Sequence, residues 1–235
     1  MNRRQSRKLG VVVGVWALVA FSNFAQAGPL YQLDDGSRET AVGNNAIGNP
    51  PVAWLNAFAA PPGGDSIFQV SVMFGGPAAG NQALFGHVVD IVVWDDPNGD
   101  GNPTDASVLA MQTHNIVAHD GGAFDIIELV APVPVVGGFF VGVYADFSDI
   151  TNVFPRALDE DTLIPGTSWV VRDAGGLDLD DLGSANFLAS TDQTNFPGVF
   201  MIRANGIPEP GTIALMAFGL AALGLERRRR KKSMN

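Results

Sequence analysis

Apolar and polar residues alternate along several short segments of this chain. In the clearest of them, 68–74, phenylalanine or valine occupies every second position, which is the period of a strand with one buried face. Further apolar runs predict strands at 87–94, 124–130, 139–145, 167–172 and 199–204, and weaker ones predict strands at 54–59 and 108–112.

Proline and glycine clusters at 61–64, 75–77 and 137–138 separate these runs. Between the two ends of the chain, no long stretch has the 3.6-residue apolar period of an amphipathic helix. The pattern therefore predicts an all-β domain: seven or eight strands in an antiparallel β-sandwich of jelly-roll or immunoglobulin-like kind. We expect residues 173–205 to be irregular, with room for one short helix.

Residues 1–27 have the pattern of a secretory signal peptide, with an N-terminal signal helix. Basic residues precede an apolar run over 9–21, and the segment ends in the Ala-Gln-Ala of 25–27, a small-residue site for signal peptidase. General secretion is the favoured route. The alternatives are twin-arginine export, which the Arg3-Arg4 pair raises, and a retained membrane anchor.

The C-terminal end has a second export pattern, over residues 207–235. Pro208, Glu209 and Pro210 precede an apolar run over 212–225, and a basic cluster follows that contains Arg227, Arg228, Arg229 and Arg230. As a helix, this run would be roughly 22 Å long, short of a 30 Å hydrocarbon core. Snorkelling arginines and local thinning of the bilayer still allow a transmembrane helix. The positive-inside rule then keeps the basic cluster in the cytoplasm.

This tail resembles the PEP-CTERM sorting signal: the string at 207–212, the Gly- and Ala-rich apolar run and the terminal arginines all match its pattern. The resemblance implies recognition by an exosortase, a membrane cysteine protease-transpeptidase, which would cleave near Pro208-Glu209-Pro210 and transfer the chain to the cell surface. It also implies an association with exopolysaccharide and biofilm. The chain would be anchored in the inner membrane before processing, and at the cell surface or extracellular afterwards. An ordinary single-pass anchor is the alternative.

The remaining domain, residues 28–206, is strongly acidic. Its only basic residues are four arginines, which stand against 22 acids and leave a formal charge of −18. Electrostatic repulsion therefore excludes nucleic acid as a partner. The chain has no cysteine, so packing alone must stabilise the domain.

One acidic segment has the spacing of calcium ligands. Asp96, Asn98 and Asp100 alternate and Gly101 follows, as at the start of a D-x-N-x-D-G calcium loop. The twelfth position is not glutamate, so the segment is not an EF-hand, but Asp105 could supply a further carboxylate. The alternative is a hairpin loop whose side chains bond their own backbone. A second acidic segment, 173–181, has less regular spacing and predicts a solvated loop.

Two catalytic patterns are incomplete. Gly64-Asp65-Ser66 resembles the start of lipase-type serine hydrolases, but that family's Asp-x-x-His pair, which would activate the serine, is missing. The pair His114 and His119 has no cysteine partner or H-E-x-x-H context for zinc. Three tryptophans, Trp54, Trp94 and Trp169, could form an aromatic platform that stacks on sugars. Trp94 and Trp169 lie in apolar runs, however, and are expected in the core.

The sequence thus predicts a non-enzymatic surface or matrix protein with an acidic β-sandwich that interacts with exopolysaccharide. The alternative is a secreted polysaccharide hydrolase, which needs two carboxylates facing each other across a cleft. The abundant acids of the domain do not select such a pair.

Overall fold

The computed structural model describes residues 30–44, 50–76 and 84–207, so the predicted signal helix and the tail from Pro208 onward lie outside the described residues. The described part contains antiparallel strands and short 3-10 helices and no α-helix, which confirms the all-β prediction. Its strands are β1 Leu30–Tyr31, β2 Thr40–Asn44, β3 Val52–Ala59, β4 Asp65–Met73, β5 Val88–Asp96, β6 Ser107–Asn115, β7 Phe124–Val135, β8 Gly138–Ala145, β9 Val153–Asp159, β10 Ser168–Arg172, β11 Phe187–Ser190, β12 Val199–Phe200 and β13 Ile202–Ile207. The 3-10 helices are η2 Pro103–Asp105, η3 Leu182–Ser184 and η4 Thr191–Gln193.

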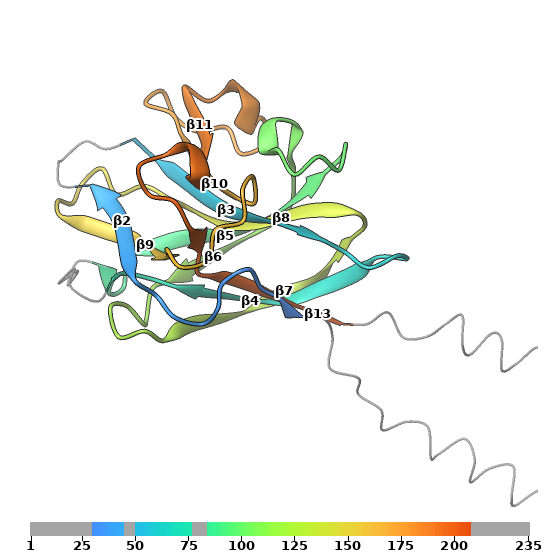
Figure 1. Ribbon diagram of the computed structural model, residues 1–235, viewed down its shortest axis with the longest axis horizontal. Helices are drawn as coiled ribbons and strands as arrows, with labels where there is room; N and C mark the ends of the chain where they lie inside the picture. Colours follow the sequence, from blue (N-terminus) through green and yellow to red (C-terminus); the bar gives the residue numbers. More distant parts are fainter. Residues whose placement is uncertain (1–29, 45–49, 77–83, 208–235) are drawn as a thin grey trace, which may run out of the picture.

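Two large sheets pack face to face (Figure 1). A four-stranded sheet has the order β1-β13-β4-β7, and a six-stranded sheet has the order β11-β10-β3-β8-β5-β6. The main core lies between them, with Trp54 and Phe139 from the six-stranded sheet in the same cluster as Val70 and Val72 from the four-stranded sheet. Because alternate residues of a strand point to opposite faces, each sheet contributes every second side chain to this core.

The outer face of the six-stranded sheet is also buried. The neighbours of the core residues along each strand, among them Leu55, Trp94 and Phe140, form a second apolar cluster with Leu182 of η3. The indole of Trp94 donates a hydrogen bond of 2.9 Å to the backbone oxygen of Leu179. The segment around η3, predicted to be irregular, therefore covers this face of the sheet.

A third sheet, with the order β12-β9-β2, stands beside the two large ones. It is formed by residues between β1 and β3 and by the long segment between β8 and β13. The buried amide of Asn56 in β3 joins the six-stranded sheet to β12 and to the start of β13, because it donates to the carbonyls of Phe200 and Ile202 at 2.8 and 3.1 Å.

The structure differs from the predicted pattern at 68–74. The side chain of Phe68 is only partly buried, whereas the preceding Ile67 is fully buried. The pairing register of β4 with β7 shifts between Ile67 and Gln69, and such a bulge moves the inward-facing set of side chains by one residue. The alternation predicted from Val70 onward is present.

The register of the strands defines two ends of the domain. Ala59 in β3 and Asp96 in β5 both pair with Gly138 at the start of β8. The short segment 60–64 leads from β3 to the start of β4, where Ser66 pairs with Ile207 at the end of β13. The last described strand therefore leaves the domain at the same end as the loop that follows Asp96.

Candidate functional site

The loop after β5 is organised by its own aspartates. The carboxylate of Asp96, at the end of β5, accepts hydrogen bonds from the backbone of Gly99 at 3.0 Å and of Gly101 at 2.9 Å. Both glycines have positive φ angles, 71° and 74°, a conformation that side chains other than glycine rarely adopt. The self-bonded hairpin loop is therefore present, with Asp96 as its anchor.

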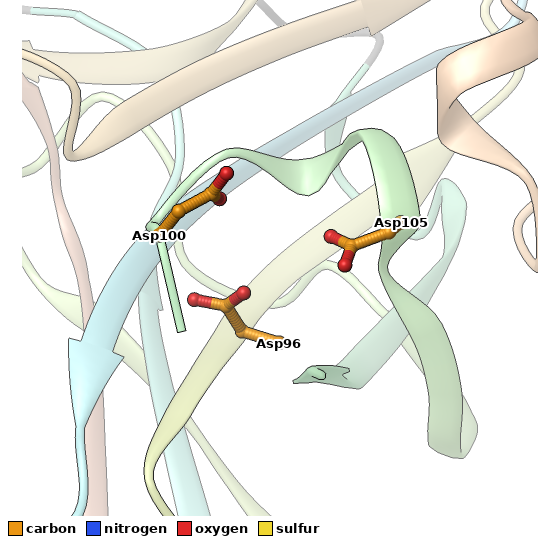
Figure 2. Close-up of side chains that lie close together, drawn as sticks. All are labelled: Asp96, Asp100 and Asp105. Atoms are coloured by element: carbon orange, nitrogen blue, oxygen red, sulfur yellow. The ribbon is translucent and has the colours of Figure 1, made fainter. Parts of the chain in front are cut away.

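The same loop brings three carboxylates together. Oxygen atoms of Asp96, Asp100 and Asp105 all lie within 4.8 Å of one another (Figure 2). Asp105 reaches this position because η2 begins at Pro103 and is capped by the side chain of Asn102, which accepts from the backbone of Thr104 at 3.2 Å. Asp96 is buried, and the other two carboxylates are exposed.

This spacing suits a hard cation. Calcium takes oxygen ligands at 2.3–2.6 Å, so two ligands on opposite sides of one ion lie about 5 Å apart. Asn98 is arranged differently: its amide oxygen accepts from the backbone of Asp100 at 2.8 Å, and its amide nitrogen donates to the carboxylate of Asp100 at 3.2 Å. Three of the four predicted ligands thus converge, and Asn98 positions one of them.

The residues of the two incomplete patterns have separate partners. Asp65 is buried and accepts from the hydroxyl of Tyr31 at 2.8 Å and from the backbone of Ser66. His114 contacts the carboxylate of Asp125 at 2.9 Å, and His119 contacts that of its neighbour Asp120 at 3.1 Å. The third histidine, His87, contacts the backbone oxygen of Asp146.

All three tryptophans are buried, as predicted for Trp94 and Trp169 and not for Trp54. Trp54 belongs to the main core, and Trp94 and Trp169 belong to the second cluster. Their rings are therefore enclosed by protein and do not form an exposed platform for sugars.

A cavity of about 390 Å³ was not predicted from the sequence. It is lined by residues of β2, β9, β10, β11 and β12, among them Arg156 and Arg172, and by residues of η4 and the segment that follows it. One signal could have indicated it: each arginine follows directly on apolar residues, in a domain that has only four arginines and no lysine.

The C-terminal residues identify a sorting signal. Residues 206–231 match the family model of the PEP-CTERM protein-sorting motif. No curated protein matches the chain. Within the described residues, no helix is long and apolar enough to cross a membrane; the helix predicted over 212–225 lies outside them.

Two solved structures of Cwp84 from Clostridium difficile are similar in fold. One is the crystal structure of its cysteine protease and lectin-like domains, with 13% sequence identity and a TM-score of 0.50. The other is Cwp84 after propeptide cleavage, with 14% identity and a TM-score of 0.50. Each match covers 78% of this chain, which spans 36% and 41% of the length of those two chains. At such low identity the likeness concerns the fold alone.

The sorting motif begins where the β domain ends, because β13 extends to Ile207 and the matched residues start at 206. The chain therefore carries a PEP-CTERM protein-sorting motif from the end of its last described strand onward, which implies export, recognition by an exosortase and membrane-anchored sorting.

Proposed function

We propose that this chain is a non-enzymatic, polysaccharide-binding or structural protein of the cell surface or extracellular matrix, delivered there through its sorting motif. The observation that carries the proposal is the junction at Ile207, where the last described strand ends and the residues that match the sorting motif begin. A domain attached in this way is presented outside the inner membrane as one unit, next to the exopolysaccharide that accompanies such sorting systems.

The strand order supports the jelly-roll rather than the immunoglobulin-like form of the sandwich. We number β1, β3, β4, β5, β6, β7, β8 and β13 from one to eight along the chain. Strands 1, 8, 3 and 6 then form one sheet, and strands 2, 7, 4 and 5 form the other, which is the jelly-roll arrangement. Lectins are among the proteins with this fold, and one of the two similar structures includes lectin-like domains. A fold alone does not determine function, so the binding itself has to be tested.

The positions of the first and last described strands support attachment of the β domain to a membrane from one side. Leu30, the first residue of β1, pairs with Asn205 near the end of β13. The first and last described residues, Leu30 and Ile207, therefore lie at the same end of the domain. The opposite end of the sandwich would face outward and be available to a matrix polymer.

Calcium is the ion that we propose for Asp96, Asp100 and Asp105. Their convergence supports it, as does the millimolar affinity range of extracellular calcium sites. Bound calcium would order the loop at the attached end of the domain and offset part of the charge of −18.

The test is binding of the full chain, purified in mild detergent, to exopolysaccharide from cells that carry an exosortase system. We expect the chain to be retained by immobilised polysaccharide and to release no new reducing ends on prolonged incubation. Calcium and a calcium-free buffer are compared at equal ionic strength.

Two results would contradict the proposal. Failure to bind any polysaccharide fraction would remove the binding function and leave only sorting and a structural role. Time-dependent release of reducing ends would instead support the alternative, a secreted polysaccharide hydrolase.

A further inference from the structure

The cavity that contains Arg156 and Arg172 is formed by the segments added to the eight jelly-roll strands. Its walls come from β2, β9, β10, β11 and β12 and from the residues after η4. A volume of about 390 Å³ is within the range of small-molecule sites, roughly 300–1,000 Å³. The segments added to the eight jelly-roll strands thus form a pocket large enough for a small-molecule ligand.

Two positive charges meet in this cavity without a negative partner. Arg156 is only 4% exposed, and its Nε donates a hydrogen bond of 3.2 Å to the carbonyl of Val42. The Nε of Arg172 is buried and has no hydrogen-bond partner, and its guanidinium lies 4.4 Å from the ring centre of Phe187. Among the arginines of the described ranges, Arg203 alone forms an ion pair with a carboxylate, that of Asp34.

This arrangement is unfavourable without an anion. Burial, and then the positive charge of Arg172, lower the pKa of Arg156 to about 10. An unpaired buried charge destabilises a fold. The domain has 22 acidic residues that could have supplied a carboxylate partner for these arginines. Since none of the described acids pairs with either arginine, a negatively charged ligand is the natural partner for the pair.

The exposed residues that line the cavity indicate what carries the negative charge. Phe196 is 48% exposed and lines the cavity together with the exposed residues Gln193 and Asn195. The ring of Phe187 also lines it. Aromatic faces pack against the apolar faces of sugar rings, and amides bond both as donors and as acceptors with hydroxyl groups. Guanidinium groups bind carboxylates in a planar, bidentate geometry.

We propose that this cavity binds a carboxylate-bearing sugar, a uronate residue of an acidic polysaccharide, with Arg156 and Arg172 on the carboxylate and Phe187 and Phe196 against the ring. This inference rests on the proposed function and assigns its ligand class and its site. The two arginines are specificity-determining residues, because they select an acidic sugar over a neutral one.

The cavity lies at the end of the domain that would face away from the membrane. Arg172, the last residue of β10, pairs with Val52 at the start of β3, whereas the domain is attached at the end where Ser66 pairs with Ile207. Since Val52 and Ala59 mark opposite ends of β3, the arginine lies at the end of the sheet that faces away from the sorting motif.

The test is calorimetric titration of the full chain, in mild detergent, with a trimer of galacturonate. A neutral glucose trimer, sulfate and phosphate are titrated in parallel. We expect the galacturonate trimer to bind and the neutral trimer to bind at least about 10-fold more weakly, because hydrogen bonds to charged groups account for roughly 10- to 100-fold in affinity.

Two variants and two matched controls locate the site. Arg172→Gln should weaken binding of the galacturonate trimer by about 10-fold or more, and Phe196→Ala should weaken it by roughly 3- to 10-fold through loss of ring contact. Arg38→Gln removes the same charge outside the cavity, where the guanidinium donates to the carbonyls of Gly75 and Asp120. Phe85→Ala removes another exposed ring. Both controls should bind within about twofold of the parent chain.

The melting temperature of the Arg172→Gln variant distinguishes a binding role of Arg172 from a structural one. Arg172→Gln removes a charge that repels Arg156 but also loses the contact with the ring of Phe187, so its melting temperature should stay close to that of the parent chain; a markedly lower value would indicate a structural arginine and count against the proposal. Phe196→Ala, at an exposed residue that lines the cavity, tests the site without touching the buried charge.

The outcomes distinguish this inference from the proposed function. If polysaccharide is retained but Arg172→Gln and Phe196→Ala bind the trimer as the parent chain does, the site is wrong and the function stands. If sulfate or phosphate binds as tightly as the galacturonate trimer, the cavity is a simple anion site and the sugar assignment is wrong. If neither the trimer nor any polysaccharide binds, both proposals fail.

Discussion

The hydroxyl of Tyr31 donates a hydrogen bond of 2.8 Å to the carboxylate of Asp65, and both side chains are buried. The bond reaches from β1 to β4 across β13, which lies between them. It passes over Gly206, where a Cβ would lie 1.7 Å from an oxygen of Asp65. Glycine is required there because the carboxylate occupies the space of a side chain. This pair therefore holds the last strand in place immediately before the sorting motif.

Removal of this bond should destabilise the domain in a pH-dependent way. Tyr31→Phe leaves one buried oxygen of Asp65 without its donor, so we expect the free energy of unfolding to fall by about 1–3 kcal/mol at neutral pH. Burial, and then the bond to Asp65, raise the pKa of Tyr31 above its ordinary value. The contribution of the neutral phenol is therefore complete below pH ~10 and is lost as the pH rises further.

Denaturant unfolding at pH 8 and pH 11 measures this difference. The parent chain should lose stability between the two values, and Tyr31→Phe should lose less. Tyr144→Phe is the control, because it removes the only other tyrosine and leaves the bond to Asp65 intact. Equal losses in the parent chain and in Tyr31→Phe would contradict the assignment.

The strand pattern was largely predictable because burial of one face leaves an alternation in the sequence. The alternation from Val70 onward and the apolar run of β8 are examples. The bulge at Phe68 was not predictable, since it depends on the partner strands. β9 was missed because Pro155 and Arg156 interrupt it, although nearly all of its side chains are buried.

The aspartate cluster and the arginine cavity also differ in how far the sequence could predict them. The carboxylates of Asp96, Asp100 and Asp105 converge within one loop, so their spacing along the chain indicated the cluster. Arg156 and Arg172 belong to different strands in different sheets. Their meeting depends on how the long segment between β8 and β13 folds back, which local sequence patterns do not encode.

The sorting motif should be required for processing of the exported chain. Replacement of Pro208, Glu209 and Pro210 by alanine should leave the chain uncleaved and retained in the membrane fraction, because the exosortase would lack its recognition sequence. A tag placed in the β domain follows the chain in membrane, surface and medium fractions by immunoblotting. Pro197→Ala, in an exposed loop of the domain, controls for the loss of a proline. Unchanged processing of the triple variant would leave an ordinary anchor as the explanation for the tail.

Calcium should stabilise the domain through Asp96, Asp100 and Asp105. A site with a dissociation constant of about 0.1 mM would, at about 1 mM calcium, add roughly 1.4 kcal/mol to the free energy of unfolding. For a domain of this size the melting temperature should rise by about 2–5 °C. Calorimetry of the full chain in mild detergent, with and without calcium, measures this shift. Magnesium and sodium at equal ionic strength measure the part that comes from screening of acidic repulsion.

Asp105→Asn is the sharpest variant for this test. Asp105 is exposed, whereas the carboxylate of Asp96 also anchors the loop through Gly99 and Gly101. Asp105→Asn should therefore melt like the parent chain without calcium and lose most of the calcium-specific shift. Asp149→Asn removes an exposed charge outside the cluster and should keep the full shift. If Asp105→Asn and Asp149→Asn gain equally from calcium, the ion acts only by screening, and the loop after β5 is a self-bonded turn.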